Sequence, residues 1–137
     1  MDGARRKHWE KEAIHISEMM HRGFYEKTIH PKDLDGYLSQ GSFSWIGAVE
    51  GENYLNKKDA ITAFSRQRDL QEVPLLEVEK GRYRVQWVSD TAILVLSIIP
   101  LSTKKETGLL LSENQRSTMI FHIEDDALRI AHIHVSN

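Results

Sequence analysis

Two histidines near the carboxyl end of the chain are its clearest candidates for chemistry. His132 and His134 alternate with apolar residues in the stretch IAHIHV, residues 130–135, a pattern typical of a strand. An imidazole exchanges a proton near neutral pH, so a histidine in an apolar pocket can act as acid or base or position a ligand carbonyl. Two other interpretations stay open, a core histidine satisfied by a neighbour and half of a metal site. We expect no metal, because the chain has no cysteine and no obvious third ligand.

The terminal hairpin, residues 116–137, must position these histidines. Its two strand-like runs flank Asp125 and Asp126, which we expect to form a two-residue turn. Side chains directly opposite each other share a face of the sheet. Counting outward from the turn then gives the pairs Phe121–Ile130, Met119–His132 and Ser117–His134. We expect this more apolar face to turn toward the helices, although a register shift of one residue would move its members outward.

The order of patterns predicts an α+β fold in a single domain, residues 1–137. Apolar residues recur at three- and four-residue spacing over residues 5–24, which indicates a helix. A short helix is expected after Pro31, a strand at 42–48 and a second long helix at 57–70. Four long antiparallel strands follow, so we expect the helices to pack on one side of a curved, mainly antiparallel sheet.

A second hairpin, residues 83–99, carries a strand that is apolar on both faces. If Ser89 and Asp90 form its turn, Arg84 and Ser97 share a face, and hydrophobicity does not decide whether that face is the inner one. Both faces of such a strand must be covered. The helices can cover one, and a second copy of the protein is the economical cover for the other. We therefore expect a homodimer through the outer sheet face; strand curvature and the loop 102–115 are the alternative.

The composition narrows the class of protein. The chain has 137 residues, a formal net charge of −2 and no basic excess, so we expect no nucleic-acid partner. The longest apolar run, residues 92–101, is far shorter than the roughly 20 residues of a membrane helix. We expect no membrane association and a cytoplasmic protein without a cofactor. The segment at 104–116 could be a lid or a partner contact.

Two segments resemble a known superfamily. SFSWIGAVEGENYLNKKDAITAFS, residues 42–65, and the ending LRIAHIHVSN resemble the nuclear transport factor 2-like (cystatin-like) superfamily in its SnoaL-like branch. The chain is particularly similar to the association, or hub, domain of calcium/calmodulin-dependent protein kinase II. The resemblance implies a cone-shaped fold, in which helices close a curved sheet around a pocket, and dimers that pack sheet to sheet.

The resemblance also implies a pocket side for the second hairpin. It turns the face with Ser97 toward the pocket. Arginines of the hub-domain pocket correspond here to Ser97 and Met119, which weakens an anion-binding interpretation. Arg84 is the candidate replacement charge.

Three functional hypotheses follow. The first is a homodimeric small-molecule-binding domain whose apolar cone pocket holds a small organic ligand. The second is a SnoaL-like enzyme, an isomerase, cyclase or dehydratase, that uses His132 as acid or base. The third is a non-catalytic oligomerisation module, for which an oligomer larger than a dimer is possible. The side chains expected to line the ligand pocket are Trp45, Tyr54, Arg84, Ser97, Met119, Phe121, His132 and His134.

Overall fold

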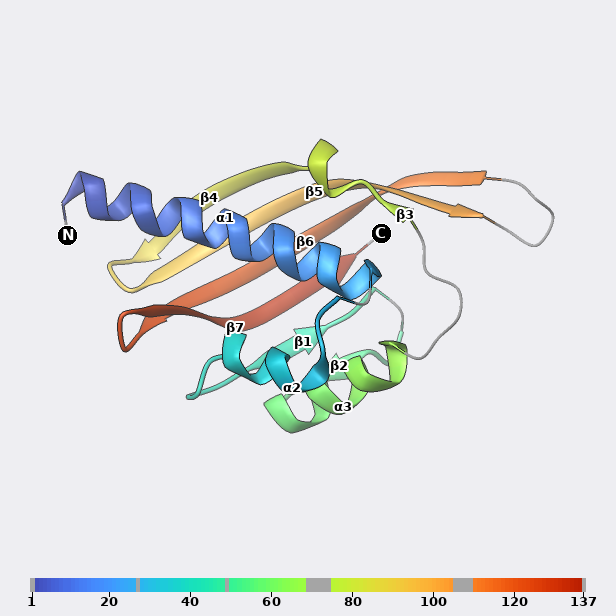
Figure 1. Ribbon diagram of the computed structural model, residues 1–137, viewed down its shortest axis with the longest axis horizontal. Coiled ribbons are helices and arrows are strands. Elements are labelled where there is room, and N and C mark those ends of the chain that lie inside the picture. Colours follow the sequence, from blue (N-terminus) through green and yellow to red (C-terminus); the bar gives the residue numbers. More distant parts are fainter. Residues whose placement is uncertain (1, 27, 49, 69–74, 105–109, 137) are drawn as a thin grey trace.

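Helices lie against one face of a single seven-stranded sheet (Figure 1). The structure is a computed structural model that describes residues 2–26, 28–48, 50–68, 75–104 and 110–136. Its elements are, in order, α1 (Gly3–Glu26), α2 (Pro31–Leu34), the 3₁₀ helix η1 (Asp35–Tyr37), β1 (Ser44–Ile46), β2 (Asn53–Tyr54), α3 (Lys57–Arg68), β3 (Leu75–Leu76), the 3₁₀ helix η2 (Val78–Lys80), β4 (Arg82–Ser89), β5 (Ala92–Lys104), β6 (Leu110–Glu124) and β7 (Ala127–Ser136). The predicted α+β fold, with helices on a mainly antiparallel sheet, is confirmed.

Strand β5 pairs with three other strands of the sheet. The strand order is β2-β1-β7-β6-β5-β3, and β4 also pairs with β5. The pairings are antiparallel except for β1 with β7, which is parallel. Among the helices that the structure describes, none is both long and apolar enough to cross a membrane.

The long helix α1 lies across the sheet because one stripe of its surface is apolar. Trp9, Ala13, Ile16 and Met20 are all buried, as their spacing predicts. The side chain of Phe24, the expected fifth member of the stripe, lies outside the described residues. At the start of the helix the Asp2 carboxylate accepts a hydrogen bond from the Arg5 backbone N–H at 2.8 Å, which satisfies one of the free amide groups of the first turn.

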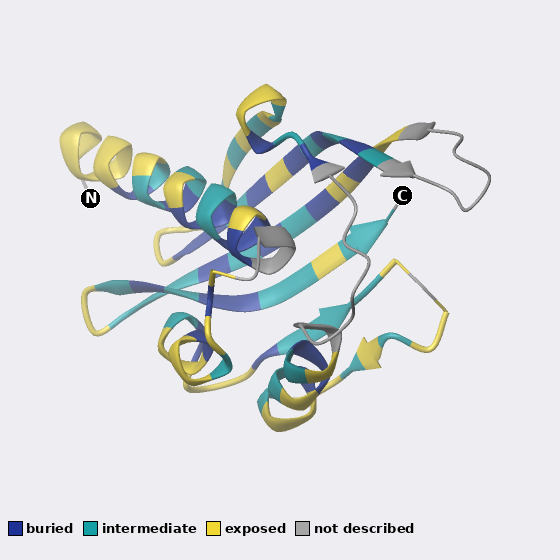
Figure 2. Ribbon diagram, turned by 45° about the vertical axis from the view of Figure 1, so that its right-hand side comes forward, coloured by how far each residue is buried: buried dark blue, intermediate teal, exposed yellow. Residues whose placement is uncertain are grey.

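The central strand β5 shows which face is the inner one. Ile93, Val95 and Ile99 are fully buried, and Ser97 between them is 2% exposed. The alternate residue Leu96 is 39% exposed and faces away from the helices. Figure 2 shows the same alternation as bands of buried and exposed residues along the strands. The expected inner position of Ser97 is therefore confirmed.

The turn of the terminal hairpin forms as predicted. Asp125 and Asp126 both have positive φ angles, 50° and 60°, as a type I′ turn requires, and Glu124 pairs with Ala127. Aspartate tolerates this backbone conformation better than most residues. The register continues as expected as far as the pair Phe121–Ile130.

Beyond that pair the predicted register is wrong. The register shifts between Ile120 and Phe121, so that Ala131 of β7 has no partner of its own, as in a β-bulge. Met119 pairs with Ile133 instead of His132, and Ser117 pairs with Val135 instead of His134. The two histidines consequently share the outer face with Ile120 and Thr118, because a shift of one residue exchanges the faces of a strand.

The position of this bulge has a structural cause. Before it, β7 meets the segment that follows η1: Leu38 bridges to Ile130, and the Ser39 N–H donates to the Ile130 carbonyl at 2.8 Å. After it, β7 pairs with β1, with Ser44 opposite His132. The extra residue lies where β7 changes partner.

A second bulge, in the hairpin of β4 and β5, puts Arg84 on the outer face instead of the predicted inner face. The turn lies at Asp90 and Thr91, Ser89 pairs with Ala92, and the register then shifts at Val88. Arg84 therefore pairs with Leu96 on the outer face, whereas Tyr83 pairs with Ser97 on the inner face. The prediction that Arg84 shares a face with Ser97 is wrong for the same physical reason as in the terminal hairpin.

Strand also forms between the predicted strand at 42–48 and the helix at 57–70, and within the segment expected as a loop before the terminal hairpin. Residues 53–54 pair with β1, and residues 110–116 belong to β6. The middle of the segment considered as a lid, 105–109, lies outside the described residues, as do residues 69–70 at the end of the second predicted helix.

Neighbouring positions on β7 test the bulge. Ile133→Ala should lower the free energy of unfolding by about 2 kcal/mol, because Ile133 packs against the core. His134→Ala should change it by less than about 0.5 kcal/mol, because His134 is exposed on the outer face. Urea unfolding of both variants gives the comparison. A larger loss of unfolding free energy for His134→Ala than for Ile133→Ala would contradict the bulge and support the register without it.

Candidate functional site

Four buried polar side chains lie on α1 and on the inner face of the sheet. Ser17 and His21 come from α1, Ser97 from β5 and Ser117 from β6, and none is more than 4% exposed. Ser17 Oγ, His21 Nε2, Ser97 Oγ and Ser117 Oγ have no hydrogen-bond partner among the described residues. A buried polar group without a partner costs about 1–3 kcal/mol, so an unpaired set of four is unusual. We call these residues the cone cluster.

The sheet register and the axis of α1 bring the cluster together. Ser97 and Ser117 are direct cross-strand partners, so their side chains are neighbours on the inner face. Near its start, α1 is held by a 3.0 Å hydrogen bond from Trp87 Nε1 of β4 to the Glu10 carboxylate. Further along, Glu18 and Arg22 lie close enough to Tyr83 of β4 to influence its pKa.

These interactions indicate where Ser17 and His21 lie along the strands of the sheet. Tyr83 pairs with Ser97, so the part of α1 next to Tyr83 lies at the level of the two sheet serines. Ser17 and His21 are four residues apart and share a stripe of the helix that is buried. Helix, β5 and β6 therefore each contribute hydrogen-bonding groups to one interior region.

The imidazole of His21 is neutral in this setting. Burial lowers its pKa from 6.5 to about 4, because the interior disfavours the charged ring. A neutral imidazole offers one donor and one acceptor nitrogen. Burial, followed by the charge of Glu18, also raises the pKa of the neighbouring Tyr83 phenol to about 12, so this group too stays uncharged.

Ser17, His21 and Ser117 were not among the site residues expected from the sequence, although signals for them were available. Ser17 and His21 each lie one position after an apolar residue of the predicted stripe, Ile16 and Met20. A helix that buries a broad face also buries these adjacent positions. Ser117 lies on the inner face because β5 and β6 pair without a register shift and Ser117 lies opposite Ser97.

Aromatic and apolar residues from the expected site surround the inner face. Met119 and Phe121 are buried in the core. Trp45 and Tyr54 are half-buried at the β1–β2 edge, with ring centroids 5.0 Å apart, and pack against the same core. The structure thus puts four expected pocket residues, with Ser97, on the inner side, and their contact with a ligand stays a prediction.

His132, His134 and Arg84 lie on the opposite face. Ser44 Oγ is 2.8 Å from His132 Nδ1, and the rings of His132 and His134 are 6.4 Å apart between centroids. Partial burial, and then the proximity of His134, lower the pKa of His132, while a hydrogen bond with the Ser44 backbone opposes the shift. Within the described residues, no group of three histidine, aspartate or glutamate side chains could hold a metal ion.

A curved sheet closed by helices, with a polar cluster inside, defines the structural class. This is the nuclear transport factor 2-like, or cystatin-like, fold, as the resemblance of the sequence implied. No family model matches the chain, and no curated protein matches it in sequence.

Solved structures give the particular likenesses. A nuclear transport factor 2-like protein of unknown function from Pseudomonas putida has a TM-score of 0.70 at 11% identity, covering 99% of this chain and 88% of its own. A type 2 hexachlorocyclohexane dehydrochlorinase has a TM-score of 0.68 at 12% identity, covering 96% and 85%. The association domain of C. elegans CaMKII has a TM-score of 0.62 at 13% identity, covering 96% and 97%. At these identities the likeness establishes the fold alone.

The neutral state of His21 predicts an acid-sensitive fold. Its folded pKa is lowered, so the unfolded chain binds the proton more tightly. The contribution of neutral His21 to the free energy of unfolding is then fully present above the unfolded pKa of 6.5. It is lost as the pH falls toward 4, a loss of about 3 kcal/mol. Urea unfolding at several pH values should show a flatter pH dependence for His21→Leu. The control His15→Ala, at an exposed position of α1, should keep the wild-type slope.

Proposed function

We propose that this protein binds a small organic molecule in the cone between α1 and the inner face of the sheet. The observation that carries the proposal is the cone cluster, whose four buried polar atoms have no partner among the described residues. A ligand with one or two hydrogen-bonding groups would satisfy some of them and recover part of the energy that their isolation costs. The surrounding apolar side chains suit the rest of such a molecule.

The charges of the cone favour a neutral ligand. His21 is neutral, and Ser97 and Met119 occupy the positions where the resemblance implies arginines. Arg84, the expected replacement, lies on the outer face. A carboxylate in the cluster would therefore lack a compensating charge from these residues. We infer a mostly apolar ligand that carries a hydroxyl, carbonyl or amide group.

The same observations favour binding over catalysis. A general base works best when its pKa lies near the working pH, and that of His21 is lowered to about 4. His132, the expected acid or base, faces outward beside Ser44 and His134. Neither histidine combines a position beneath α1 with a pKa near neutrality, so we rank the enzyme second.

Ser117 and its neighbour Thr118 allow a matched test. They are adjacent on β6 but face opposite sides of the sheet. Native mass spectrometry of the protein as purified from cells should show a stoichiometric organic component. Ser117→Ala should retain that component at least fivefold less, whereas Thr118→Val should retain it as the wild type does.

The same pair gives a stability readout. After removal of the ligand, Ser117→Ala should be more stable than the wild type by about 1 kcal/mol, because an unpaired buried hydroxyl is gone. A wild-type protein without any bound component, together with a destabilised Ser117→Ala variant, would contradict the proposal.

Assembly through the outer face of the sheet is a separate candidate function, which does not involve the cone. Leu94, Ile98 and Ile120 are only half-buried there, and Leu96 is 39% exposed. These residues occupy neighbouring ladder positions on β5 and β6, so they form a continuous apolar strip. The association domain among the similar folds gives the precedent for self-association. We propose that a second copy of the chain covers the strip, with a larger oligomer as a further possibility.

Leu96 lies near the centre of this strip and tests the dimer. Leu96→Lys should convert a dimer into a monomer, because the contact would bury an unpaired ammonium group beside Arg84, the like-charged cross-strand partner of residue 96. Size-exclusion chromatography with light scattering measures the mass. Val88→Lys, at an exposed apolar position beside the turn, is the control and should leave a dimer intact. A monomeric wild-type protein would contradict the assembly.

A further inference from the structure

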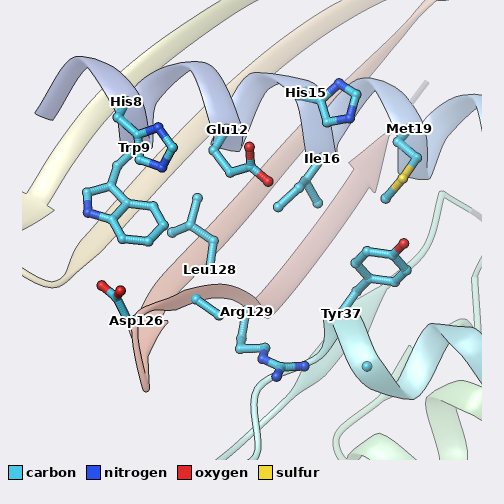
Figure 3. A pocket seen from close by; sticks show the side chains of 12 residues that line it. His8, Trp9, Glu12, His15, Ile16, Met19, Tyr37, Asp126, Leu128 and Arg129 are labelled. Atoms are coloured by element: carbon cyan, nitrogen blue, oxygen red, sulfur yellow. The ribbon is translucent and has the colours of Figure 1, made fainter. Parts of the chain in front are cut away.

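A groove separates α1 from η1 and the β6–β7 turn, and none of the cone cluster lines it. Its volume is about 520 Å³, within the usual range for organic ligands. Trp9, Ile16 and Leu128 form a buried apolar floor. Figure 3 shows the two walls: α1 contributes a row of side chains along one side, and Tyr37 and the hairpin lie across from it.

Glu12 is the distinctive residue of this groove. It projects from α1 toward the hairpin between His8 and His15 (Figure 3). The side chain is half-buried, and its carboxylate has no hydrogen-bond or ion-pair partner among the described residues. A carboxylate next to an apolar floor loses hydration, and a cation would restore the lost stabilisation.

Asp126 and Arg129, which also line the groove, already have opposite charges nearby. The Asp126 carboxylate forms a 2.7 Å ion pair with Arg5 at the rim. The Arg129 guanidinium points away from α1 (Figure 3) and is close enough to Glu124 to contribute to the lowered pKa of that carboxyl group. His8 and His15 are exposed imidazoles. The charge left for a ligand is therefore the negative charge of Glu12.

The walls suit the rest of an amine-bearing molecule. Tyr37 offers an aromatic ring, the rings of His8 and Trp9 lie 5.1 Å apart between centroids, and Met19 adds a flexible apolar surface. Aromatic faces attract cations, and methionine adapts to irregular ligands. We propose that the groove is a second ligand site, separate from the cone, for an organic cation: a protonated amine on an aromatic or aliphatic body, with Glu12 as its counter-ion.

Three probes of similar shape and different charge test this site. They are 2-phenylethylamine, the neutral 2-phenylethanol and the anionic 3-phenylpropionate, each titrated at pH 7. The chain has three tryptophans, so its indole N–H signals in NMR spectra serve as reporters. Trp9 lines the groove, whereas Trp45 borders the cone. We expect the amine to shift the Trp9 signal without shifting that of Trp45, and to bind at least tenfold more tightly than the other two probes.

A pair of charge-removing variants completes the experiment. Glu12→Gln should weaken binding of the amine at least tenfold, whereas Glu79→Gln, exposed on η2 and outside the groove lining, should not change it. Equal binding of the three probes, unchanged binding to Glu12→Gln, or no shift of the Trp9 signal up to millimolar amine would each overturn the inference. A shift of the Trp45 signal alone would instead report occupancy of the cone.

Discussion

The alternation of side chains along β5 is the constraint on which the rest of the structure depends. This strand pairs with β6 on one side and with β4 and β3 on the other, so its two faces set those of its neighbours. Its inner side chains are fully buried under the helices, and its outer ones remain partly exposed. The Trp87–Glu10 hydrogen bond then fixes α1 over the inner face, which brings a helical histidine and serine to the sheet serines.

Two bulges determine which side chains lie on each face of the sheet. Before Ala131, β7 turns Leu128 and Ile130 inward; after it, Ile133 replaces them and the histidines turn outward. The shift at Val88 does the same for Arg84. The interior is therefore apolar with a few neutral polar groups, including His21, while the guanidinium of Arg84 and the imidazoles of His132 and His134 lie on the outer face. This distribution argues for a neutral ligand inside and leaves the outer face for assembly.

Local patterns predicted much of this fold. The helical stripe of α1, the two-aspartate turn and the doubly apolar β5 all follow from spacing and residue type, because each depends on neighbours in the sequence. The bulge at Ala131 depends on distant partners instead, because it lies where β7 exchanges the segment after η1 for β1. A hairpin counted from its turn cannot include that exchange, so Met119 and Phe121 were placed correctly and His132 and His134 were not. The resemblance placed Ser97 correctly, and the shift at Val88 moved Arg84 to the outer face.

The most direct test of the account is a crystal structure of the protein as purified, at a resolution that reveals ordered water. Ligand binding in the cone predicts continuous density of an organic molecule within hydrogen-bond distance of at least two of the four polar groups His21, Ser17, Ser97 and Ser117. If those groups bond to one another, or only to separate water molecules, the cone is a hydrated core and the proposed ligand-binding function is wrong.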